Sequence, residues 1–580
     1  MSEASITGPD PHSRDHQAYP VLTPEQIDRI LPHAQRRHYG DGDLLFEAGH
    51  RGAGLFVVLA GTVSVTRRDG LGNDLPVVEH GSGHFLGEVG QLSGKPALVD
   101  GRAVGEVETL LLTPEALRTL LVAEAEVGEL IMLALILRRV RLIESGTGGP
   151  TLIGSAEAPE MIRLSGFLTR NGQPFTIVDP DSGESDAAFA ARYPRQAGFA
   201  VLAVCPNGTL LRNPTEMEIA KAIGLSDYDP ERLYDVAVVG AGPAGLATAV
   251  YAASEGLSVI VLDSRAFGGQ AGASARIENY LGFPTGITGQ ALAGRAFVQA
   301  EKFGAQIVVP APVTQLECGH PTHLMRLVDG RRVEARTVVV ASGAAYRQPD
   351  IPNLARFEGR GISYWASPVE AKLVAGQEVV LVGGGNSAGQ AAVFLASAAS
   401  MVHMMIRSDG LSATMSQYLV DRIAANPRIR LHTRTEIVSL KGDRAGLSGA
   451  VWRNRDTGEE THCPSRHIFL FVGADPNTDW LHGCWIELDR HGFVLTGRDL
   501  GAAALAAAGW DEGREPHPLE TSIPGIFAIG DVRLGSVKRV AAAVGEGAAV
   551  VAQIHTYLAA LDQRQAEQGR AADGRVSELA

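Results

Sequence analysis

One glycine turn constrains the fold of this 580-residue chain more than any other feature. The apolar residues 234–239 lead into the turn, and the small residues 246–255 follow it as an expected helix. A second apolar segment, residues 258–262, comes next and is followed directly by Asp263. Glycines at such a turn let backbone N–H groups approach a pyrophosphate at the positive end of the helix, and the acid can accept hydrogen bonds from ribose hydroxyls. This order predicts a dinucleotide-binding α/β domain, whose expected ligand-binding residues are Gly240, Gly242, Ala244, Gly245 and Asp263.

A second turn of the same kind lies further along the chain. The apolar residues 379–382 precede it, and a helix of small residues is expected after it. Strands and helices alternate from about residue 234 to residue 561, which is typical of a doubly wound α/β fold. The residues expected to bind the second nucleotide are Gly383, Gly385, Asn386 and Ser387.

Four further motifs accompany the two turns in a fixed order. They are Gly268-Gly269-Gln270, Ile277-Glu278-Asn279-Tyr280, the apolar segment 338–344 with Gly343, and Gly530-Asp531. Together with the turns, they resemble the low-molecular-weight thioredoxin reductases over about 325 residues, from 234 to 558. The resemblance implies that FAD and NAD(P)H are the cofactors, with the NAD(P) domain inserted in the FAD domain.

The resemblance also implies roles for individual residues. Asp531 should bond the ribityl chain of FAD, and Gln270 and Asn279 should line the flavin pocket. The helix that starts near residue 539 should point its positive end at the flavin, where negative charge collects on reduction. In the NAD(P) domain, Arg407 is the one match to the arginines that hold the 2′-phosphate of NADPH, so the preference between NADH and NADPH stays open.

The family's redox dithiol is missing. Trp365 and Pro368 stand where the two cysteines of the Cys-x-x-Cys motif are expected, so no residue is assigned a catalytic role. Dithiol exchange needs a thiolate, so the family's usual route of thioredoxin reduction is not expected. The chain has four cysteines, with no two close in sequence, which predicts neither a disulfide scaffold nor a sequence-local metal site. Cys463 and Cys484 could substitute for the dithiol, but such cysteines are more often buried apolar residues.

The N-terminal segment, residues 21–145, has the pattern of a β-barrel or jelly roll. Strands are expected at residues 44–46, 54–59, 63–67 and 74–79, followed by a helix over 114–143 and a linker over 145–150. The sequence around Gly87-Glu88 resembles the cyclic-nucleotide-binding fold, in which this pair holds the ribose. The arginine expected nine or ten residues later is replaced by Ala97 and Leu98, and the next arginine is Arg102. Losing a charged hydrogen bond of about 1.5–3 kcal/mol should weaken nucleotide binding roughly ten- to a hundredfold.

Residues 158–225 resemble a degenerate thioredoxin-like unit without its cysteines, and we expect it to act as a spacer or docking surface. The whole chain resembles bacterial fusions of a cyclic-nucleotide-binding-like domain with a thioredoxin-reductase-like module that lacks the dithiol. The expected domains are residues 21–145, the thioredoxin-like unit 158–225, the FAD domain 232–347 and 474–561, and the NAD(P) domain 348–473.

Charge and hydropathy exclude several other classes of protein. The net charge of −14 argues against a nucleic-acid partner. Residues 130–137 are too short to span a membrane, and the N-terminus lacks the apolar core of a signal peptide. We therefore expect a cytoplasmic protein and, from the resemblance, a homodimer. The polar tail after Leu561 is expected to fray.

Three functions are compatible with these features. The first is an FAD-dependent NAD(P)H oxidoreductase that passes electrons to an unidentified acceptor, which can be a protein. The second is electron transfer of the ferredoxin–NAD(P) reductase type. The third is a signalling protein in which FAD is structural or sensory. Rapid bleaching of the flavin by NAD(P)H would separate the first two from the third.

Overall fold

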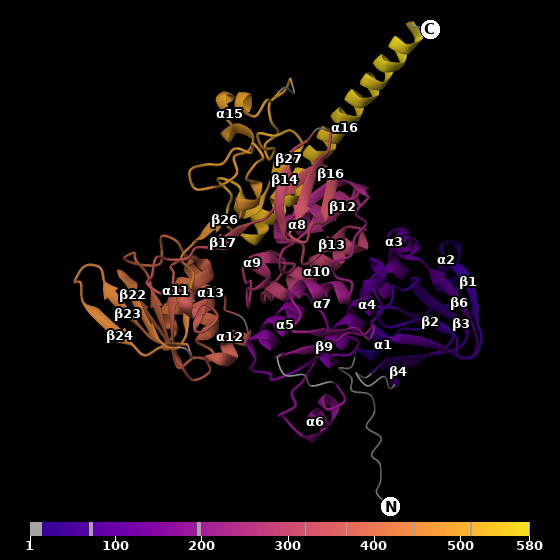
Figure 1. Cartoon of the computed structure of the whole chain (residues 1–580), viewed down its shortest axis with the longest axis horizontal. Helices are drawn as coiled ribbons and strands as arrows, with labels where there is room; N and C mark the ends of the chain where they lie inside the picture. The colour runs from indigo at the N-terminus through magenta and orange to yellow at the C-terminus, as the bar shows by residue number, and fades with distance from the viewer. Residues whose placement is uncertain are drawn as a thin grey trace, which may run out of the picture.

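Four sheet-based units follow one another along the chain, as Figure 1 shows from the indigo N-terminal barrel to the yellow C-terminal helix. The computed structural model describes residues 14–68, 74–193, 199–319, 321–366, 368–443, 446–510 and 513–578. Among these residues, no helix combines the length and the apolar content needed to cross a membrane.

The N-terminal unit is an antiparallel barrel with the strand order β1-β6-β3-β4. In addition, β2 pairs with β6, and β5 pairs with β3. Its strands are β1 (Gln35–Tyr39), β2 (Leu44–Phe46), β3 (Leu55–Arg68), β4 (Asp74–His80), β5 (Phe85–Leu86) and β6 (Asp100–Leu112). Its helices are α1 (Asp15–Ala18), α2 (Pro24–Ile30), η1 (Leu31–His33), η2 (Val89–Leu92), α3 (Pro114–Ala123) and α4 (Ala125–Ser145).

Two expectations for the barrel were wrong in detail. Residues 54–59 and 63–67 do not form two strands, because the chain continues through Gly61 as the single strand β3. Gly61 has φ +86° and sits where the register against β6 shifts, so the glycine makes a bulge instead of ending the strand. The single helix expected over 114–143 is broken at Glu124, whose φ of −114° and ψ of 77° are not helical.

The second unit has the topology expected of a thioredoxin-like fold. Its strand order is β10-β9-β7-β8, with β7 parallel to β8 and antiparallel to β9. The strand β7 immediately follows the linker and was missed in the sequence, because three residues are too few to show an alternating pattern. The elements are β7 (Thr151–Ile153), α5 (Pro159–Arg170), β8 (Thr176–Val178), α6 (Glu184–Ala190), β9 (Leu202–Val204), β10 (Leu210–Arg212) and α7 (Glu216–Ala222).

The third unit is a sheet with the order β13-β12-β11-β16-β15-β14, and β27 pairs with β16. Its first glycine turn connects β11 to α8, whose small residues are buried against α16 and α10. The elements are β11 (Leu233–Val239), α8 (Pro243–Ser254), β12 (Val259–Leu262), α9 (Gly269–Gly272), α10 (Gly289–Lys302), β13 (Gln306–Val308), β14 (Val313–Glu317), β15 (His323–Leu327), β16 (Arg332–Val340), η3 (Asp479–Leu481), η4 (Gly497–Asp499), α15 (Ala502–Ala507), β27 (Ile526–Ala528), η5 (Gly530–Val532) and α16 (Val540–Glu578).

The inserted unit is drawn in orange in Figure 1 and contains a parallel sheet, β18-β25-β19-β20-β21, and an antiparallel sheet, β22-β23-β24. The antiparallel pair β17–β26 connects it to the third unit. The elements are β17 (Ala344–Tyr346), α11 (Leu354–Phe357), β18 (Ile362–Ser363), α12 (Pro368–Leu373), β19 (Glu378–Val382), α13 (Asn386–Leu395), β20 (Met401–Met405), α14 (Gln417–Ala425), β21 (Ile429–His432), β22 (Thr435–Gly442), β23 (Leu447–Asn454), β24 (Glu460–Cys463), β25 (Ile468–Leu470) and β26 (Ala474–Pro476).

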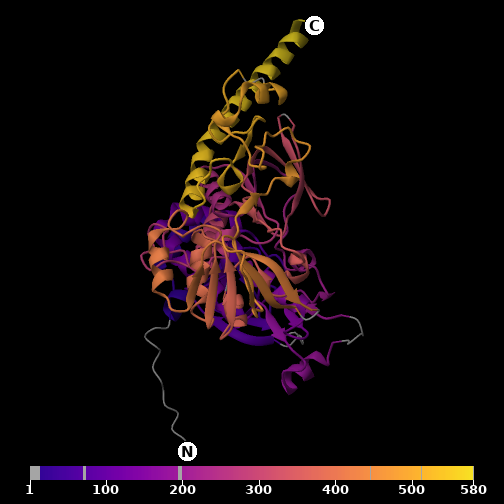
Figure 2. The same cartoon turned by 90° about the vertical axis from the view of Figure 1, so that its left-hand side faces the viewer.

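The C-terminal helix differs from the expected frayed tail. It runs without a break from Val540 to Glu578, and Figure 2 shows it extending beyond the rest of the molecule. The residues after Leu561 lack proline and are mostly good helix formers, and adding residues to an existing helix avoids the cost of nucleation.

Candidate functional site

The first glycine turn has the geometry that a dinucleotide site requires. Gly240 has φ +113°, and a Cβ added there would lie 2.2 Å from the carbonyl oxygen of Ala341. A Cβ at Gly245 would lie 1.9 Å from the carbonyl oxygen of Gly240. Gly242 is the N-cap of α8, and no side chain caps the helix there. Its first backbone N–H groups are therefore available to an anion.

Asp263 directly follows β12 and lies beside this turn, as the sequence predicts. Its Oδ2 accepts a hydrogen bond from the backbone N–H of Ala241 at 2.8 Å, and its Oδ1 accepts from Arg265 and Ala266 at 2.9 and 3.1 Å. Burial raises the pKa of the carboxyl, and these three backbone N–H groups oppose that rise. A carboxylate has about four acceptor positions, so Asp263 can hold the turn and still receive a ribose hydroxyl.

The motifs that follow the first turn in sequence meet it in space. Gly268 donates its N–H to the carbonyl oxygen of Ala241 at 2.7 Å, and a Cβ at Gly269 would lie 3.1 Å from the Cα of Gly242. Gln270 donates its side-chain amide to the carbonyl oxygen of Ala344, one residue after Gly343. Gly530 approaches from the C-terminal segment, since a Cβ there would lie 3.1 Å from the Cβ of Ala244. Asn279, by contrast, lies exposed on its loop.

Asp531 lies in a partly buried site with charged neighbours that the sequence analysis did not find. Burial raises the pKa of its carboxyl, Glu546 raises it further, and Lys538 opposes the rise. Lys538 also donates to the backbone carbonyl of Asp531 at 2.5 Å. Asp531 in turn is close enough to Tyr346 to add to the effect of burial, which raises the pKa of that phenol to about 12.

The second glycine turn repeats the geometry of the first. Gly383 has φ +144°, and a Cβ there would lie 2.4 Å from the carbonyl oxygen of Phe471. Gly385 is the N-cap of α13, again with no side-chain cap. Asn386 accepts the backbone N–H of Ser416 with its side-chain oxygen at 2.7 Å, so it positions the start of α14, whereas the Ser387 side chain is exposed.

The end of β20 offers one exposed cation, Arg407, and a nearby acid, Asp409. Asp409 pairs with Arg434 at 2.6 Å, and Arg434 also pairs with Asp456 at 2.6 Å. Two carboxylates therefore already occupy Arg434, which leaves Arg407 as the side chain of this group that can meet a phosphate.

The two positions at which the resemblance places the dithiol hold a tryptophan and a proline. Trp365 follows β18 and donates its indole N–H to Glu370 of α12 at 2.9 Å, and Pro368 begins α12. The neighbouring Tyr364 stacks on Tyr346 with ring centroids 6.3 Å apart. The segment that should carry the dithiol is thus in contact with the strand that links the two nucleotide domains.

The cysteines correct the sequence analysis. Cys318 and Cys484 form a disulfide across 166 residues, although no disulfide was expected from their spacing. The sheet strand β14 and the turn η3 bring them together, which sequence separation cannot show. Cys463 and Cys484, the pair offered as a substitute dithiol, are not partners, since Cys463 and Cys205 are buried free thiols. Burial raises the pKa of Cys205 to about 11.

In the N-terminal barrel, the acid expected to hold a ribose already has a partner. Glu88 is buried, and its Oε2 lies 3.3 Å from Nη1 of Arg139 on α4. Ala97 exchanges backbone hydrogen bonds with Gly49 and His50, at 2.7 and 2.9 Å. Arg102 donates to the carbonyl oxygen of Gly42 at 2.6 Å from an exposed position of β6. The described residues therefore offer neither a free acid nor a replacement cation at these positions.

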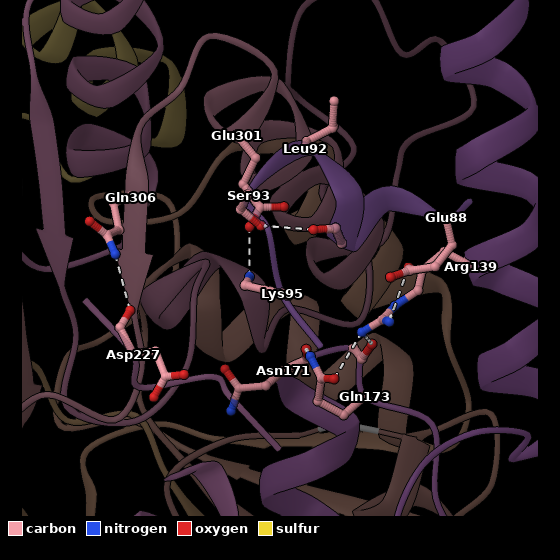
Figure 3. Close-up of polar contacts among 12 residues, drawn as sticks. Glu88, Leu92, Ser93, Lys95, Arg139, Asn171, Gln173, Asp227, Glu301 and Gln306 are labelled. Carbon is pink, nitrogen blue, oxygen red and sulfur yellow. Dashed lines mark hydrogen bonds and ion pairs between the residues drawn. The ribbon is translucent and has the colours of Figure 1, made fainter. Parts of the chain in front are cut away.

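The polar groups around Glu88 instead join the first three units, as Figure 3 shows. Arg139 also donates to Gln173 of the thioredoxin-like unit at 2.9 Å. Lys95 donates to Glu301 of α10 at 2.6 Å, and the Glu301 side chain is only 1% exposed. Asn171 donates to the carbonyl oxygen of Arg265 at 3.0 Å, two residues after Asp263. We name Lys95, Arg139, Asn171 and Glu301 the interdomain polar cluster.

The two glycine turns and Gly343, which follows β16, leave room for the expected ligands. A Cβ added at Gly242, Gly343 or Gly385 would meet no atom of the described residues within 4 Å. The backbone at these three positions therefore faces open space, as close approach of a pyrophosphate requires.

Comparison with known proteins assigns two parts of the chain to families. Residues 234–547 match the family described as pyridine nucleotide-disulphide oxidoreductase, and residues 36–124 match the cyclic nucleotide-binding domain. The chain is 32% identical to NADPH-dependent thioredoxin reductase 3 of Arabidopsis thaliana over 366 residues, which make up 60% of this chain and 65% of that protein. It is 31% identical to thioredoxin reductase of Peptoclostridium litorale over 57% of this chain and 98% of the other. Among solved structures, Lactococcus lactis thioredoxin reductase in its FR conformation aligns with a TM-score of 0.50 and 28% identity, covering 56% of this chain and 99% of the other.

Proposed function

Because this chain belongs to the pyridine nucleotide-disulphide oxidoreductase family, we propose that it oxidises NAD(P)H through FAD and delivers the electrons without a dithiol in the inserted domain. The observation that carries the proposal is the combination of two open glycine turns with Trp365 and Pro368 at the dithiol positions. When bound, FAD supplies the hydride-accepting and electron-donating chemistry.

The residues of the FAD domain bind and orient the cofactor in this proposal. The N-terminus of α8 at Gly242 holds the pyrophosphate, and Asp263 accepts a ribose hydroxyl. Asp531 accepts hydrogen bonds from the ribityl chain, which would satisfy a carboxylate that burial otherwise disfavours. The helix α16 starts at Val540, one residue from the expected start, and its positive end favours negative charge on the flavin.

The inserted domain binds the nicotinamide nucleotide. Gly385, at the N-terminus of α13, receives the pyrophosphate, and Arg407 is the cation for a 2′-phosphate. A single exposed arginine gives modest discrimination, because exposed ion pairs contribute about 0–1 kcal/mol. We therefore expect both nucleotides to serve, with no strong preference for NADPH.

The electron acceptor is the finer part of the proposal. A carrier of the ferredoxin type needs no dithiol on the reductase, since single electrons pass to it from the flavin. We propose such a soluble one-electron carrier ahead of thioredoxin, with a homodimer acting in the cytoplasm. Cytosolic disulfides are usually transient or redox-sensing, so the Cys318–Cys484 pair is expected to be reduced there.

A sensory function is the second candidate, and the interdomain polar cluster is the observation that favours it. Within the cluster, Lys95 connects the cyclic nucleotide-binding domain to α10, and Asn171 connects the thioredoxin-like unit to the loop after Asp263. In this reading the N-terminal domain responds to the state of the FAD domain, and turnover with an acceptor is secondary.

Anaerobic stopped-flow mixing with NADH or NADPH separates these functions. Rapid bleaching of the flavin, followed by reoxidation with ferredoxin but not with thioredoxin, supports the reductase. Gly385→Val is a suitable variant, because its side chain would fill the open space at the second turn. It should bind FAD and still be reduced by dithionite while losing reduction by NAD(P)H. No bleaching of the wild type at millimolar nucleotide would favour the sensory function.

A further inference from the structure

Three side chains with metal-binding atoms meet between the two sheets of the inserted domain. Glu378 begins β19, His403 lies in β20 and Cys463 ends β24. One ligand atom from each residue lies within 4.8 Å of the other two. The residues come from three strands and are separated by 25 and 60 positions, so no local sequence pattern indicates them.

The spacing of two of these atoms already fits a tetrahedral metal. Nε2 of His403 lies 3.3 Å from Oε2 of Glu378. Nitrogen and oxygen ligands bind zinc at about 2.0–2.2 Å, which places two tetrahedral ligands roughly 3.4 Å apart. The thiol must move closer to reach the bonding distance of about 2.3 Å. The Glu378 side chain is 56% exposed, so it can rotate toward the thiol without displacing the core.

The surroundings of His403 match those of a metal-bound imidazole. Its other nitrogen, Nδ1, lies 3.0 Å from Nε2 of His432. A ligating histidine usually donates its other ring N–H to an acceptor, which fixes the tautomer and the orientation of the ring, and Nε2 of His432 can accept this bond. The Trp452 ring packs beside both histidines, with its centroid 5.5 Å from the His403 ring and 5.3 Å from the His432 ring.

We propose that Glu378, His403 and Cys463 bind a divalent transition metal, with zinc as the ion that best matches this ligand set. Thiolate, imidazole and carboxylate are the ligand types that zinc takes in proteins. The exposed side of Glu378 leaves the fourth position to water. On binding, the thiol of Cys463 forms a sulfur–metal bond and its proton passes to solvent, while Nε2 of His403 binds as the unprotonated nitrogen.

We expect this metal to stabilise the packing of the two sheets of the inserted domain. Its three ligands tie the antiparallel sheet, through β24, to neighbouring strands β19 and β20 of the parallel sheet. The glycine turn at Gly383 lies at the opposite end of β19 from Glu378, so the ion does not contact the nucleotide.

Metal analysis of the purified holoprotein tests the proposal. We expect about one zinc per chain after dialysis, and uptake of Co²⁺ by metal-depleted protein with absorption bands to the red of the flavin bands. In Cys463→Ser, both the zinc content and the Co²⁺ absorption should fall at least tenfold. Cys205→Ser is the matched control, since Cys205 is also a buried free thiol, and it should keep both.

Glu378→Gln keeps the proposal testable if Cys463→Ser does not fold. Its side chain is exposed, so it should fold normally and bind Co²⁺ at least tenfold more weakly. A wild type that holds no zinc and takes up no Co²⁺ at micromolar concentration would overturn the proposal. So would Co²⁺ bands that are unchanged in the Cys463 or Glu378 variant.

Discussion

The indole nitrogen of Trp365 lies 2.9 Å from Oε1 of Glu370, so the side chain at the position expected for the first cysteine is held by the start of the next helix. An indole in this place can pack against the flavin when the inserted domain rotates toward it. We expect Trp365→Ala to keep FAD but to change flavin fluorescence and the rate of reoxidation by oxygen.

Glu370→Gln is the control for this variant, because the amide oxygen can still accept the indole N–H. It should behave as the wild type in both measurements. Unchanged fluorescence and reoxidation in Trp365→Ala would place the indole away from the flavin. Thioredoxin turnover by the wild type would contradict the larger claim and direct mutagenesis to Cys318 and Cys484.

Nucleotide selectivity should depend on Arg407 and be small. We expect Arg407→Ala to lower kcat/KM for NADPH by up to about fivefold and to leave kcat/KM for NADH unchanged, because the arginine meets only the 2′-phosphate. Arg430→Ala, on the exposed side of β21, should affect neither nucleotide. A wild-type preference for NADPH above about a thousandfold, roughly 4 kcal/mol, would mean that further cations reach the phosphate.

Cyclic AMP and cyclic GMP should bind weakly or not at all. Glu88 is paired with Arg139, and Arg102 donates to the backbone of Gly42. Calorimetric titration should therefore give no sub-micromolar affinity for either nucleotide. Tight binding that is lost in Glu88→Gln would show that Arg139 gives up its partner to the ligand.

The pair Lys95–Glu301 should stabilise the contact between the barrel and α10. Lys95→Met leaves a buried carboxylate without its cation, which should lower the free energy of unfolding by roughly 2–4 kcal/mol. Methionine can still pack on the Phe297 ring, over which the ammonium now lies at 4.7 Å. Lys95→Met combined with Glu301→Leu should recover most of the loss in a urea titration. If Lys95→Met has the same free energy of unfolding as the wild type, the buried pair contributes nothing to stability.

Asp531 should make the FAD-free protein less stable at neutral pH. Burial raises its folded pKa above the unfolded value of about 3.9, so the favourable protonated form is lost as the pH rises through the folded pKa. Asp531→Asn should therefore be more stable than the wild type at pH 7, with the difference vanishing below about pH 4. The same variant should bind FAD more weakly. Equal stability at both pH values would contradict the assigned environment of the carboxyl.

Local patterns in the sequence were enough to predict the two nucleotide turns. At Gly240, Gly245 and Gly383 a Cβ would clash with a backbone oxygen, so only glycine fits. A glycine requirement of this kind can be recognised from the few residues around the turn. The sequence also indicated the barrel and the thioredoxin-like unit. The barrel differed in detail at Gly61. A glycine was expected to end the strand, but here it forms a bulge within β3.

Contacts between distant segments could not be predicted in this way. The disulfide Cys318–Cys484 and the ion pair Lys95–Glu301 join residues more than 160 positions apart. Each depends on how whole units pack, and periodicity within one segment carries no information about that. The partner of Glu88 was missed for the same reason. The sequence placed Arg139 in a helix but could not show that it pairs with an acid of the barrel.

The pairing of β17 with β26 has a consequence for the ancestry and engineering of the chain. Ala344 lies opposite Pro476, and Tyr346 lies opposite Ala474, so the inserted domain leaves and re-enters the FAD domain at adjacent points. Antiparallel neighbours can be joined by a hairpin of about two residues. The FAD domain could therefore close on itself after excision of residues 347–473, and a minimal flavin-binding protein could be made by replacing them with Asn-Gly.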